Sequence, residues 1–383
     1  MPGPRRWINW LIALTSIVVC LLAIELAARV WVQIKWTDAD VADVVEPRFS
    51  RAGYVQDTVI GYRLQPTFER VDTKERAFTH NSLGFRGPEI SVTKSPGTLR
   101  VAIVGASTVY GIYVDDRETS ASVLEELLRD GIPGHGVEVL NGGVPGWTSR
   151  ESLVRLRETV TRLQPDVVVF IDGRNDAFPQ LFNGFTSDYL HYRRPDWRMS
   201  EGNRAWKRVF RFSRLAMVLV PNGGGVLGFS RREEDPVYGY VDFDNRPNDM
   251  EGLRSNAAVP ARFDGWRANL TAEIEFVLAH DATPVLVEVP FRAPGYRSGT
   301  LPGVLFGPEL TAQVVDVVAE TVQRNNEIAR ELAIAYELAF VEIDTLLSER
   351  YLIDDTHFNA EGERLLAELL RPVVQRALLE RGG

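Results

Sequence analysis

Apolar and amphipathic stretches alternate along residues 99–383. The apolar stretches are short, continuous runs rich in valine, isoleucine and leucine, which is typical of strands buried on both faces of a parallel sheet. We expect strands over residues 100–104, 137–140, 166–171, 284–289 and 339–343. Between these runs, apolar residues recur at helical spacing. We expect helices over residues 121–128, 149–163, 266–279, 308–336 and 360–379.

The regular alternation of these segments predicts a parallel sheet that is covered by helices on both faces. Ser149 and Asn359 stand at the start of two of the helices, as N-cap residues do. We therefore predict an α/β fold, a three-layer α/β/α sandwich with about five parallel strands. In such a sheet, ligands bind at the carboxyl ends of the strands.

The first apolar run, residues 7–24, differs from the others in its length. It carries no charge, follows Arg5 and Arg6, and precedes Glu25. A run of this length lies near the lower limit for crossing a bilayer, and residues 26–36 could extend the helix. The sequence lacks a clean Ala-x-Ala site after the run, which favours an uncleaved anchor over a cleaved signal peptide or a soluble helix. The two arginines favour a cytoplasmic N-terminus, so we expect a single-pass protein of the cytoplasmic membrane whose catalytic domain is extracytoplasmic.

These patterns divide the chain into three parts: a membrane anchor over 1–36, a turn-rich juncture over 37–98 and a main domain over 99–383. The juncture contains a segment, 81–89, whose glycines and proline are typical of a turn-rich loop or hairpin. We interpret this segment as a structural turn that Phe85 packs onto the main domain. The alternative is that Arg86 reaches toward an anionic substrate group.

The main domain carries an insertion at about 177–262 that exceeds an ordinary loop between a strand and a helix. Its residues 206–215 form a basic amphipathic stretch. One interpretation is a lid or interfacial helix that meets anionic lipid headgroups. We favour a helix that packs over the sheet with its arginines in water, because charged faces are commonly just solvated.

Composition limits the partners and cofactors. The 383 residues carry a formal net charge of −9, which argues against a nucleic-acid partner. Cys20 is the only cysteine, so an internal disulfide is impossible. The sequence contains no His-x-His or His-Glu-x-x-His spacing, no Gly-x-Gly-x-x-Gly and no Walker loop. We therefore expect no metal and no nucleotide cofactor.

Polar and glycine-rich motifs follow three of the expected strands, and another precedes the last helix. Because the carboxyl ends of parallel strands meet at one edge of a sheet, we expect all of these motifs to lie on one rim. They are Gly-Ala-Ser-Thr at 105–108, Asn-Gly-Gly-Val-Pro-Gly at 141–146, Gly-Arg-Asn-Asp at 173–176 and Asp-Asp-Thr-His at 354–357.

Together, these motifs contain the groups that acyl transfer through a serine ester requires. Ser107 is a weak nucleophile that needs a base, and the neutral imidazole of His357 suits that role. Asp354 precedes the histidine by three residues, which on a helical turn puts both side chains on one face. The carboxylate can then orient the imidazole, while backbone N–H groups of Ser107 and Gly146 and the Asn175 amide meet the oxyanion.

The ordered set resembles the SGNH/GDSL hydrolase superfamily, whose blocks centre on a serine, a glycine, an asparagine and a histidine. The resemblance covers about residues 99–380 and implies a flavodoxin-like fold. It also implies Ser107 as nucleophile, Gly146 and Asn175 as oxyanion donors, and His357 as a base oriented by Asp354.

In one place the sequence departs from the family pattern, because the family's Gly-Asp-Ser block reads Gly-Ala-Ser at residues 105–107. The missing aspartate is not a member of the triad, so we expect the chemistry to be preserved. The anchor and the segment 81–87 resemble those of bacterial membrane-attached members of the superfamily.

The predicted function is a serine acyl-esterase that acts on a small-molecule, lipid or glycan ester of the cell envelope. Two alternatives stay open. The same triad could pass the acyl group to a sugar hydroxyl, as in an O-acyltransferase of envelope glycans, or the domain could be a catalytically silent binding module, which Ala106 keeps conceivable. An α/β-hydrolase elbow is disfavoured, because Val109 stands where its second glycine would be.

Overall fold

The computed structural model describes residues 4–35, 53–72, 74–193, 213–215, 240–291, 311–343, 348 and 350–382. The chain forms two compact units. One comprises Met1–Tyr54 and Asp196–Gly239, and the other comprises Val55–Pro195 and Tyr240–Gly383. The second unit contains the sheet and all the candidate site residues.

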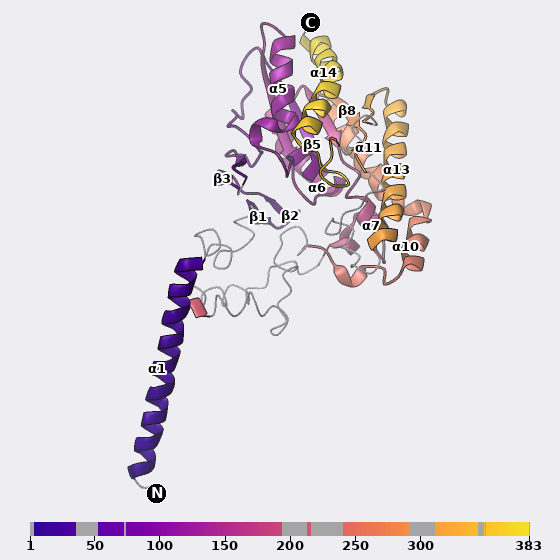
Figure 1. Ribbon diagram of the computed structural model, residues 1–383. Helices are drawn as coiled ribbons and strands as arrows, with labels where there is room; N and C mark the ends of the chain where they lie inside the picture. Colours follow the sequence, from indigo (N-terminus) through magenta and orange to yellow (C-terminus); the bar gives the residue numbers. More distant parts are fainter. Residues whose placement is uncertain are drawn as a thin grey trace. The chain divides into compact units, whose positions relative to one another are not determined.

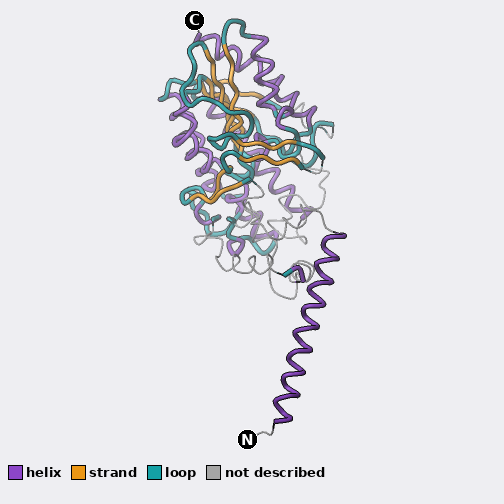
Figure 2. The backbone as a smooth tube through the Cα atoms, turned by 90° about the vertical axis from the view of Figure 1, so that its left-hand side faces the viewer, coloured by secondary structure: helices purple, strands orange, loops and turns teal. Residues whose placement is uncertain are grey.

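The sheet of the second unit has five strands, all parallel, in the order β6-β5-β7-β8-β9. The strands are β5 (Thr98–Gly105), β6 (Gly136–Gly143), β7 (Val167–Ile171), β8 (Thr283–Val287) and β9 (Ala339–Val341). Each lies at a predicted apolar run, so the predicted α/β fold with five parallel strands is confirmed. In Figures 1 and 2 the strands run between layers of helices.

Helices cover both faces of this sheet. On one face lie α5 (Ser120–Gly131) and α14 (Ala360–Gly382), which pack against each other and against the strands. On the other face lie α6 (Ser149–Arg155), α11 (Asp264–Ala279) and α13 (Thr311–Ala335). On this second face, alternate strand residues such as Ala102, Val168 and Leu286 pack against Trp266 and its neighbours in a buried core. The three layers predicted from the sequence are therefore present.

The helix boundaries differ most from prediction over residues 149–163. The helix predicted over 149–163 is α6, followed by a π-helical turn (Leu156–Val160) and a 3₁₀ turn (Thr161–Leu163). Its N-cap is Thr148 rather than the predicted Ser149, because the Thr148 hydroxyl and N–H both donate to the Glu151 carboxylate in a capping box. The N-cap predicted at Asn359 is confirmed, since its side-chain oxygen accepts the N–H of Gly362 at 2.9 Å. Residues 308–310 of the helix predicted over 308–336 lie outside the described residues.

Smaller elements complete the second unit. They are β1 (Tyr54–Asp57), β2 (Gly61–Leu64), β3 (Phe68–Val71), β4 (Ala77–His80), α4 (Ser107–Tyr110), α7 (Ala177–Leu181), α10 (Met250–Ala257) and the 3₁₀ turns Asp116–Glu118, Leu190–Tyr192, Phe243–Asn245 and Pro260–Phe263. Strands β1 and β2 form one two-stranded pair, and β3 and β4 form an antiparallel one.

Most of the segment predicted as a separate juncture belongs to the same compact unit as the sheet. Residues 55–98 lie in the second unit, whereas the sequence analysis begins the main domain at residue 99. Phe85 is buried in the core beneath the sheet, as predicted for a structural turn. The side chain of Arg86 is only 1% exposed and donates to Asp116 at 2.7 Å and to the carbonyls of Tyr110 and Gly111 at 2.6 Å each. The alternative that Arg86 faces a substrate is therefore wrong, because its donors hold the end of α4 instead.

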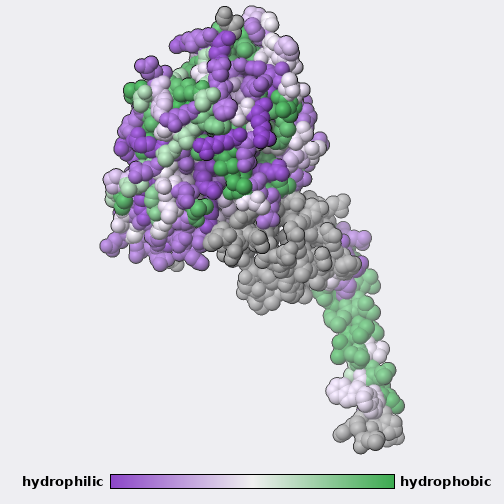
Figure 3. Space-filling view, turned by 180° about the vertical axis from the view of Figure 1, so that it is seen from behind, coloured by the Kyte–Doolittle hydropathy of each residue, from purple (hydrophilic) through white to green (hydrophobic). Residues whose placement is uncertain are grey.

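The first unit contains α1 (Pro4–Lys35), whose residues 7–35 are long enough and apolar enough to cross a membrane, as those of a signal sequence also can be. Figure 3 shows hydrophobic side chains over the visible face of this helix. The Glu25 carboxylate accepts hydrogen bonds from the Ser213 hydroxyl at 2.7 Å and the Arg214 N–H at 2.9 Å. Of the basic stretch predicted over 206–215, residues 206–212 lie outside the described residues, so its helical interpretation stays a prediction.

Candidate active site

The candidate site lies where the strand order of the sheet reverses direction. Strand β5 comes first in the chain and has β6 on one side and β7 on the other. Its last residue, Gly105, is level with Gly143 of β6 and with Ile171 of β7. The three motifs that follow these strands therefore leave the sheet at the same edge, which is the ligand-binding edge of open parallel sheets.

Ser107 is the first residue of α4, directly beyond the end of β5. This short helix packs closely on β6. A Cβ atom at Gly143 would lie 2.2 Å from the backbone nitrogen of Tyr110, so only glycine permits the approach. The close packing fixes the backbone that carries the serine.

His357 joins Ser107 and Asp354 in one chain of hydrogen bonds. Its Nε2 atom lies 2.7 Å from Ser107 Oγ, and its Nδ1 atom lies 2.7 Å from Asp354 Oδ2. Because a carboxylate only accepts, Nδ1 carries the proton and Nε2 accepts from the serine hydroxyl. This is the tautomer that a histidine base requires.

Asp354 reaches His357 through a turn and not through the helical spacing that the sequence analysis assumed. The two residues lie before α14, outside any helix. Asp354 Oδ1 accepts the N–H groups of Thr356 at 3.0 Å and His357 at 2.8 Å, which folds the loop back onto the carboxylate. Burial raises the pKa of Asp354, but its hydrogen bonds with His357 and with the backbone N–H groups of Thr356 and His357 outweigh burial and hold that pKa well below its usual range. The carboxylate is therefore ionised beside the imidazole.

Tyr113 is a further neighbour of the acid/base pair. Its ring lies edge-on to the His357 imidazole, with 5.5 Å between the ring centroids. Burial together with the charge of Asp354 raises the pKa of Tyr113 to about 12. The tyrosine is thus neutral beside the ionised carboxylate.

Gly146 lies in a loop that is held by the segment N-terminal to the sheet. Its φ of 81° is a left-handed conformation, which favours glycine. The Tyr62 hydroxyl donates to the Pro145 carbonyl at 2.7 Å, and Trp147 Nε1 donates to the Tyr62 carbonyl at 3.1 Å. Strand β2 therefore bonds to the residues on both sides of the predicted oxyanion donor, to the Pro145 backbone and to the Trp147 side chain.

Asn175 is buried between two neighbours of opposite hydrogen-bonding character. Its Nδ2 atom donates to the Trp147 carbonyl at 2.8 Å, and its Oδ1 atom accepts from Arg174 Nη1 at 3.1 Å. Since Nδ2 carries two hydrogens, one remains for a substrate oxygen. The structure thus places Ser107, His357 and Asp354 in contact, with Gly146 and Asn175 on the adjoining motifs of the same sheet edge.

A cluster of buried carboxyl groups lies behind Asn175. Asp172 follows β7, and burial together with the charge of Asp176 raises its pKa to about 8. Burial also raises the pKa of Asp176 to about 6 and that of Glu273 well above its usual value. Among the described residues, Asp172 Oδ2 and both Glu273 carboxyl oxygens have no hydrogen-bond partner. The protonated forms of Asp172 and Glu273 are therefore the stable ones near neutral pH.

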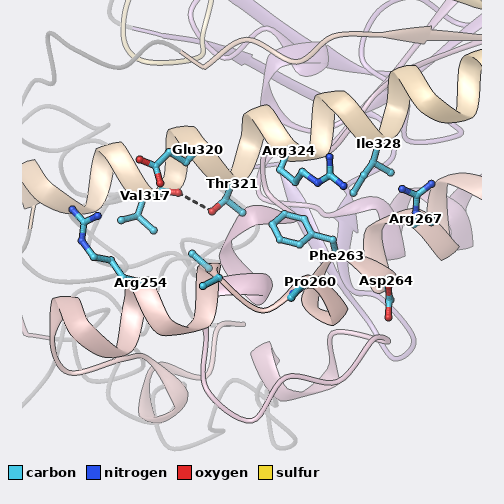
Figure 4. A pocket seen from close by; sticks show the side chains of 12 residues that line it. Arg254, Pro260, Phe263, Asp264, Arg267, Val317, Glu320, Thr321, Arg324 and Ile328 are labelled. Atoms are coloured by element: carbon cyan, nitrogen blue, oxygen red, sulfur yellow. Dashed lines mark hydrogen bonds between the residues drawn. The ribbon is translucent and has the colours of Figure 1, made fainter.

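A cavity of about 570 Å³ lies elsewhere, between α10, α11 and α13 (Figure 4). Arg254, Arg267 and Arg324 line it together with Glu320 and Asp264, and none of the candidate site residues does. Within the described part of the chain, no three histidine, cysteine, aspartate or glutamate side chains group as metal ligands would.

Sequence reasoning missed Tyr62, Tyr113 and the ion pair between Arg174 and Asp355. Arg174 and Asp355 stand inside the motifs at 173–176 and 354–357, but the motifs by themselves assign them no function. Tyr62 and Tyr113 lie outside every motif, and their contacts with the site depend on the folding of distant segments. No signal in a single sequence identifies them.

Comparison with known proteins gives a consistent picture. The sequence profile described as "GDSL-like Lipase/Acylhydrolase family" matches residues 103–365, which is more than half of the chain. No curated protein sequence matches the chain.

Several solved structures are similar to this one. A GDSL-like lipase from Bacteroides thetaiotaomicron has 15% identity and a TM-score of 0.38, over 74% of this chain and 88% of that one. A lipase/acylhydrolase from Enterococcus faecalis has 18% identity and a TM-score of 0.38, over 73% and 96%. An acetyl xylan esterase from Geobacillus stearothermophilus has 15% identity and a TM-score of 0.39, over 75% and 97%.

Proposed function

The chain belongs to the GDSL-like lipase/acylhydrolase family and is an ester-hydrolysing enzyme, and we propose that it works through a Ser107–His357–Asp354 triad on an ester of the cell envelope. The observation that carries the triad is the 2.7 Å contact between Ser107 Oγ and His357 Nε2, with Asp354 on the opposite ring nitrogen. A silent binding module would have no need of this hydrogen-bonded chain. Ala106 leaves the chain of contacts unbroken.

In the proposed acylation step, Ser107 Oγ attacks the ester carbonyl carbon while His357 Nε2 takes the hydroxyl proton. The carbonyl oxygen becomes an oxyanion, which accepts hydrogen bonds from the N–H groups of Ser107 and Gly146 and from the free Asn175 Nδ2–H. The first N–H groups of a helix have no partner within it, which leaves that of Ser107 available. The tetrahedral intermediate collapses when the alcohol leaves with the proton from His357, and an acyl-serine remains.

Deacylation repeats these steps with water. His357 takes a proton from the water as the water oxygen attacks the acyl-serine, and the same N–H groups donate hydrogen bonds to the second oxyanion. The ester bond to Ser107 Oγ then breaks, the carboxylic acid leaves, and the proton on His357 returns to the serine. If a sugar hydroxyl replaces the water, the same steps give an O-acyltransferase.

We further propose that α1 anchors the protein in the cytoplasmic membrane, with the catalytic unit outside. The support is the apolar stretch at 7–35, whose mean hydropathy is 2.5 over its best window and which is almost wholly exposed. Arg5 and Arg6 precede it, in keeping with a cytoplasmic N-terminus. The substrate would then be a lipid, glycan or small-molecule ester of the envelope.

A fluorophosphonate probe tests the proposed chemistry directly, because it reacts only with an activated serine. We expect the full-length protein in detergent to be labelled at Ser107 and to hydrolyse p-nitrophenyl esters. A series of acyl chain lengths, run with water alone and with added oligosaccharide, separates hydrolysis from transfer. Labelling at another serine, or no labelling of active protein, would exclude the proposed nucleophile.

A further inference from the structure

Arg174 connects two motifs that the proposed mechanism treats separately. Its Nη1 atom donates to Asn175 Oδ1 at 3.1 Å, and its Nη2 atom donates to Asp355 Oδ2 at 2.9 Å. The side chains of Arg174 and Asp355 are only 6% and 5% exposed. The guanidinium also lies over the rings of Phe178 and Phe291. The guanidinium thus contacts two aromatic rings and is hydrogen-bonded at both terminal nitrogens, which holds it beside Asn175.

The guanidinium decides which way the Asn175 amide points. An amide can turn over and exchange its oxygen for its nitrogen with little change in shape. Here the Trp147 carbonyl requires a donor, and Arg174 Nη1 requires an acceptor. The reversed amide would place oxygen against oxygen and N–H against N–H. Only the observed orientation leaves an Nδ2–H for the oxyanion.

The charge of Arg174 also acts on the amide electronically. A cationic donor on Oδ1 draws electron density from the amide, and hydrogen bonds in series strengthen one another. The free Nδ2–H of Asn175 is therefore a stronger donor to a developing oxyanion than an isolated amide would be. Asp355 balances the charge, so a buried cation is held without an unpaired charge beside His357.

Asp355 belongs to the loop that carries the acid/base pair. It lies between Asp354 and Thr356, and the Thr356 hydroxyl is anchored on the Pro290 carbonyl at 2.9 Å. The ion pair therefore ties the loop after β7 to the loop before α14. Movement of one loop would disturb both the oxyanion donor and the base.

We infer that Arg174 and Asp355 are positioning residues, which fix the Asn175 amide as an oxyanion donor and hold it in register with His357. This inference rests on the proposed function, since it needs Asn175 to meet the oxyanion. Neither residue touches the reacting atoms. Their effect should therefore appear in turnover and not in substrate binding.

The test uses the full-length protein in detergent, with p-nitrophenyl acetate as substrate. Removing Arg174 alone would leave the Asp355 carboxylate buried and unpaired, so the principal variant replaces both residues, as Arg174→Met/Asp355→Leu. We expect kcat to fall about 10- to 100-fold with KM within about 3-fold, since loss of an oxyanion donor costs about 10²–10³ in turnover. Arg174→Lys keeps the charge without the planar fork, so we expect kcat to fall roughly 10-fold. This variant serves if the double one does not fold.

The same substitutions in an Asn175→Ala background separate positioning from general support. We expect Asn175→Ala to lose about 10²–10³ in kcat and the added double substitution to remove no more than about 3-fold further. Arg100→Met is the matched control, because Arg100 is also buried and paired, with Glu138, but at the opposite end of β5. It should lower the melting temperature and leave kcat unchanged.

Three results overturn the inference: unchanged kcat in the double variant, a rise in KM that accounts for the loss, or an equal loss in both backgrounds. Fluorophosphonate labelling shows which proposal has failed. If the wild-type protein is labelled at Ser107 and hydrolyses the ester, and the double variant has the same kcat, only the positioning role is excluded. If the probe does not label the wild-type protein at Ser107, both the proposed function and the positioning role are excluded.

Discussion

His357 Nε2 lies 2.7 Å from Ser107 Oγ although 250 residues separate the two in the chain. The serine is held by α4 at the end of β5, and the histidine is held by the turn around Asp354 before α14. Two rigid supports therefore meet at one hydrogen bond. The first predictions follow from that contact.

Replacing the serine should abolish turnover without unfolding the protein. Ser107 has no large side chain to lose, so we expect Ser107→Ala to remove ester hydrolysis and fluorophosphonate labelling and to leave the melting temperature within about 2 °C. Activity assays, labelling and thermal unfolding on the same preparation check this. Near wild-type hydrolysis by the variant would contradict the nucleophile assignment.

The acid/base pair should act with the serine as one unit. We expect His357→Ala to lose as much kcat as Ser107→Ala, and Asp354→Asn to lose somewhat less, because the orienting carboxylate is the least costly member of a triad to remove. In the Ser107→Ala/His357→Ala double variant, the residual rate should match that of either single variant. Losses that multiply in the double variant would mean that the two residues act independently.

Tyr62 tests the contribution of β2 to the oxyanion loop. Tyr62→Phe removes the donor to the Pro145 carbonyl and leaves that carbonyl without its partner, so the backbone around Gly146 should loosen. We expect kcat to fall on the order of 10-fold with little change in KM, since misplacement of a catalytic group is costly. Tyr351→Phe, at a half-buried position before α14, is the control and should leave kcat unchanged. Equal kcat for Tyr62→Phe and wild type would show that β2 does not position this donor.

The buried carboxyl cluster should make the fold less stable as pH rises. The pKa of Asp172 is about 8 in the folded protein, whereas that of an aspartate in an unfolded chain is about 3.9. Because the folded pKa is the higher one, the stabilising contribution is complete below the unfolded pKa and is lost as pH rises through about 8. Melting temperatures should therefore fall between about pH 5 and pH 8, by about 2–4 °C for each kcal/mol lost.

Asp172→Asn should flatten this dependence, because an amide does not titrate. Asp176 and Glu273 also have raised pKa values, so a smaller slope should persist. Asp316→Asn, at an exposed position of α13, should keep the wild-type slope. An Asp172→Asn curve parallel to the wild-type curve would show that Asp172 is not protonated in the fold.

The proposed topology can be tested in cells. An uncleaved anchor predicts that the protein fractionates with membranes at its full mass of 43.0 kDa. Protease added to intact spheroplasts should digest the catalytic unit, since the N-terminal arginines favour an inside N-terminus. Protection from protease would place the site in the cytoplasm, and a soluble form shortened by roughly 3 kDa would favour a cleaved signal.

The sequence by itself determined the layers of the fold and the order of the motifs. Continuous apolar runs such as 167–171 can be satisfied only by burial on both faces, so β7 and its neighbours were predictable from local pattern. The position of Ser107 at a strand end followed from the same rule. Interactions that are local in the chain were therefore available from the sequence.

Only the tertiary structure decided how the site is supported. The Asp354 carboxylate reaches His357 through a turn that its own side chain stabilises, and not through a helix. Tyr62 and the pair of Arg174 with Asp355 meet the site across 83 to 181 residues of sequence separation. Such contacts depend on which segments the sheet brings together and on the burial that selects paired polar groups. The residues next to a position in the chain determine neither its contacts with distant segments nor its burial.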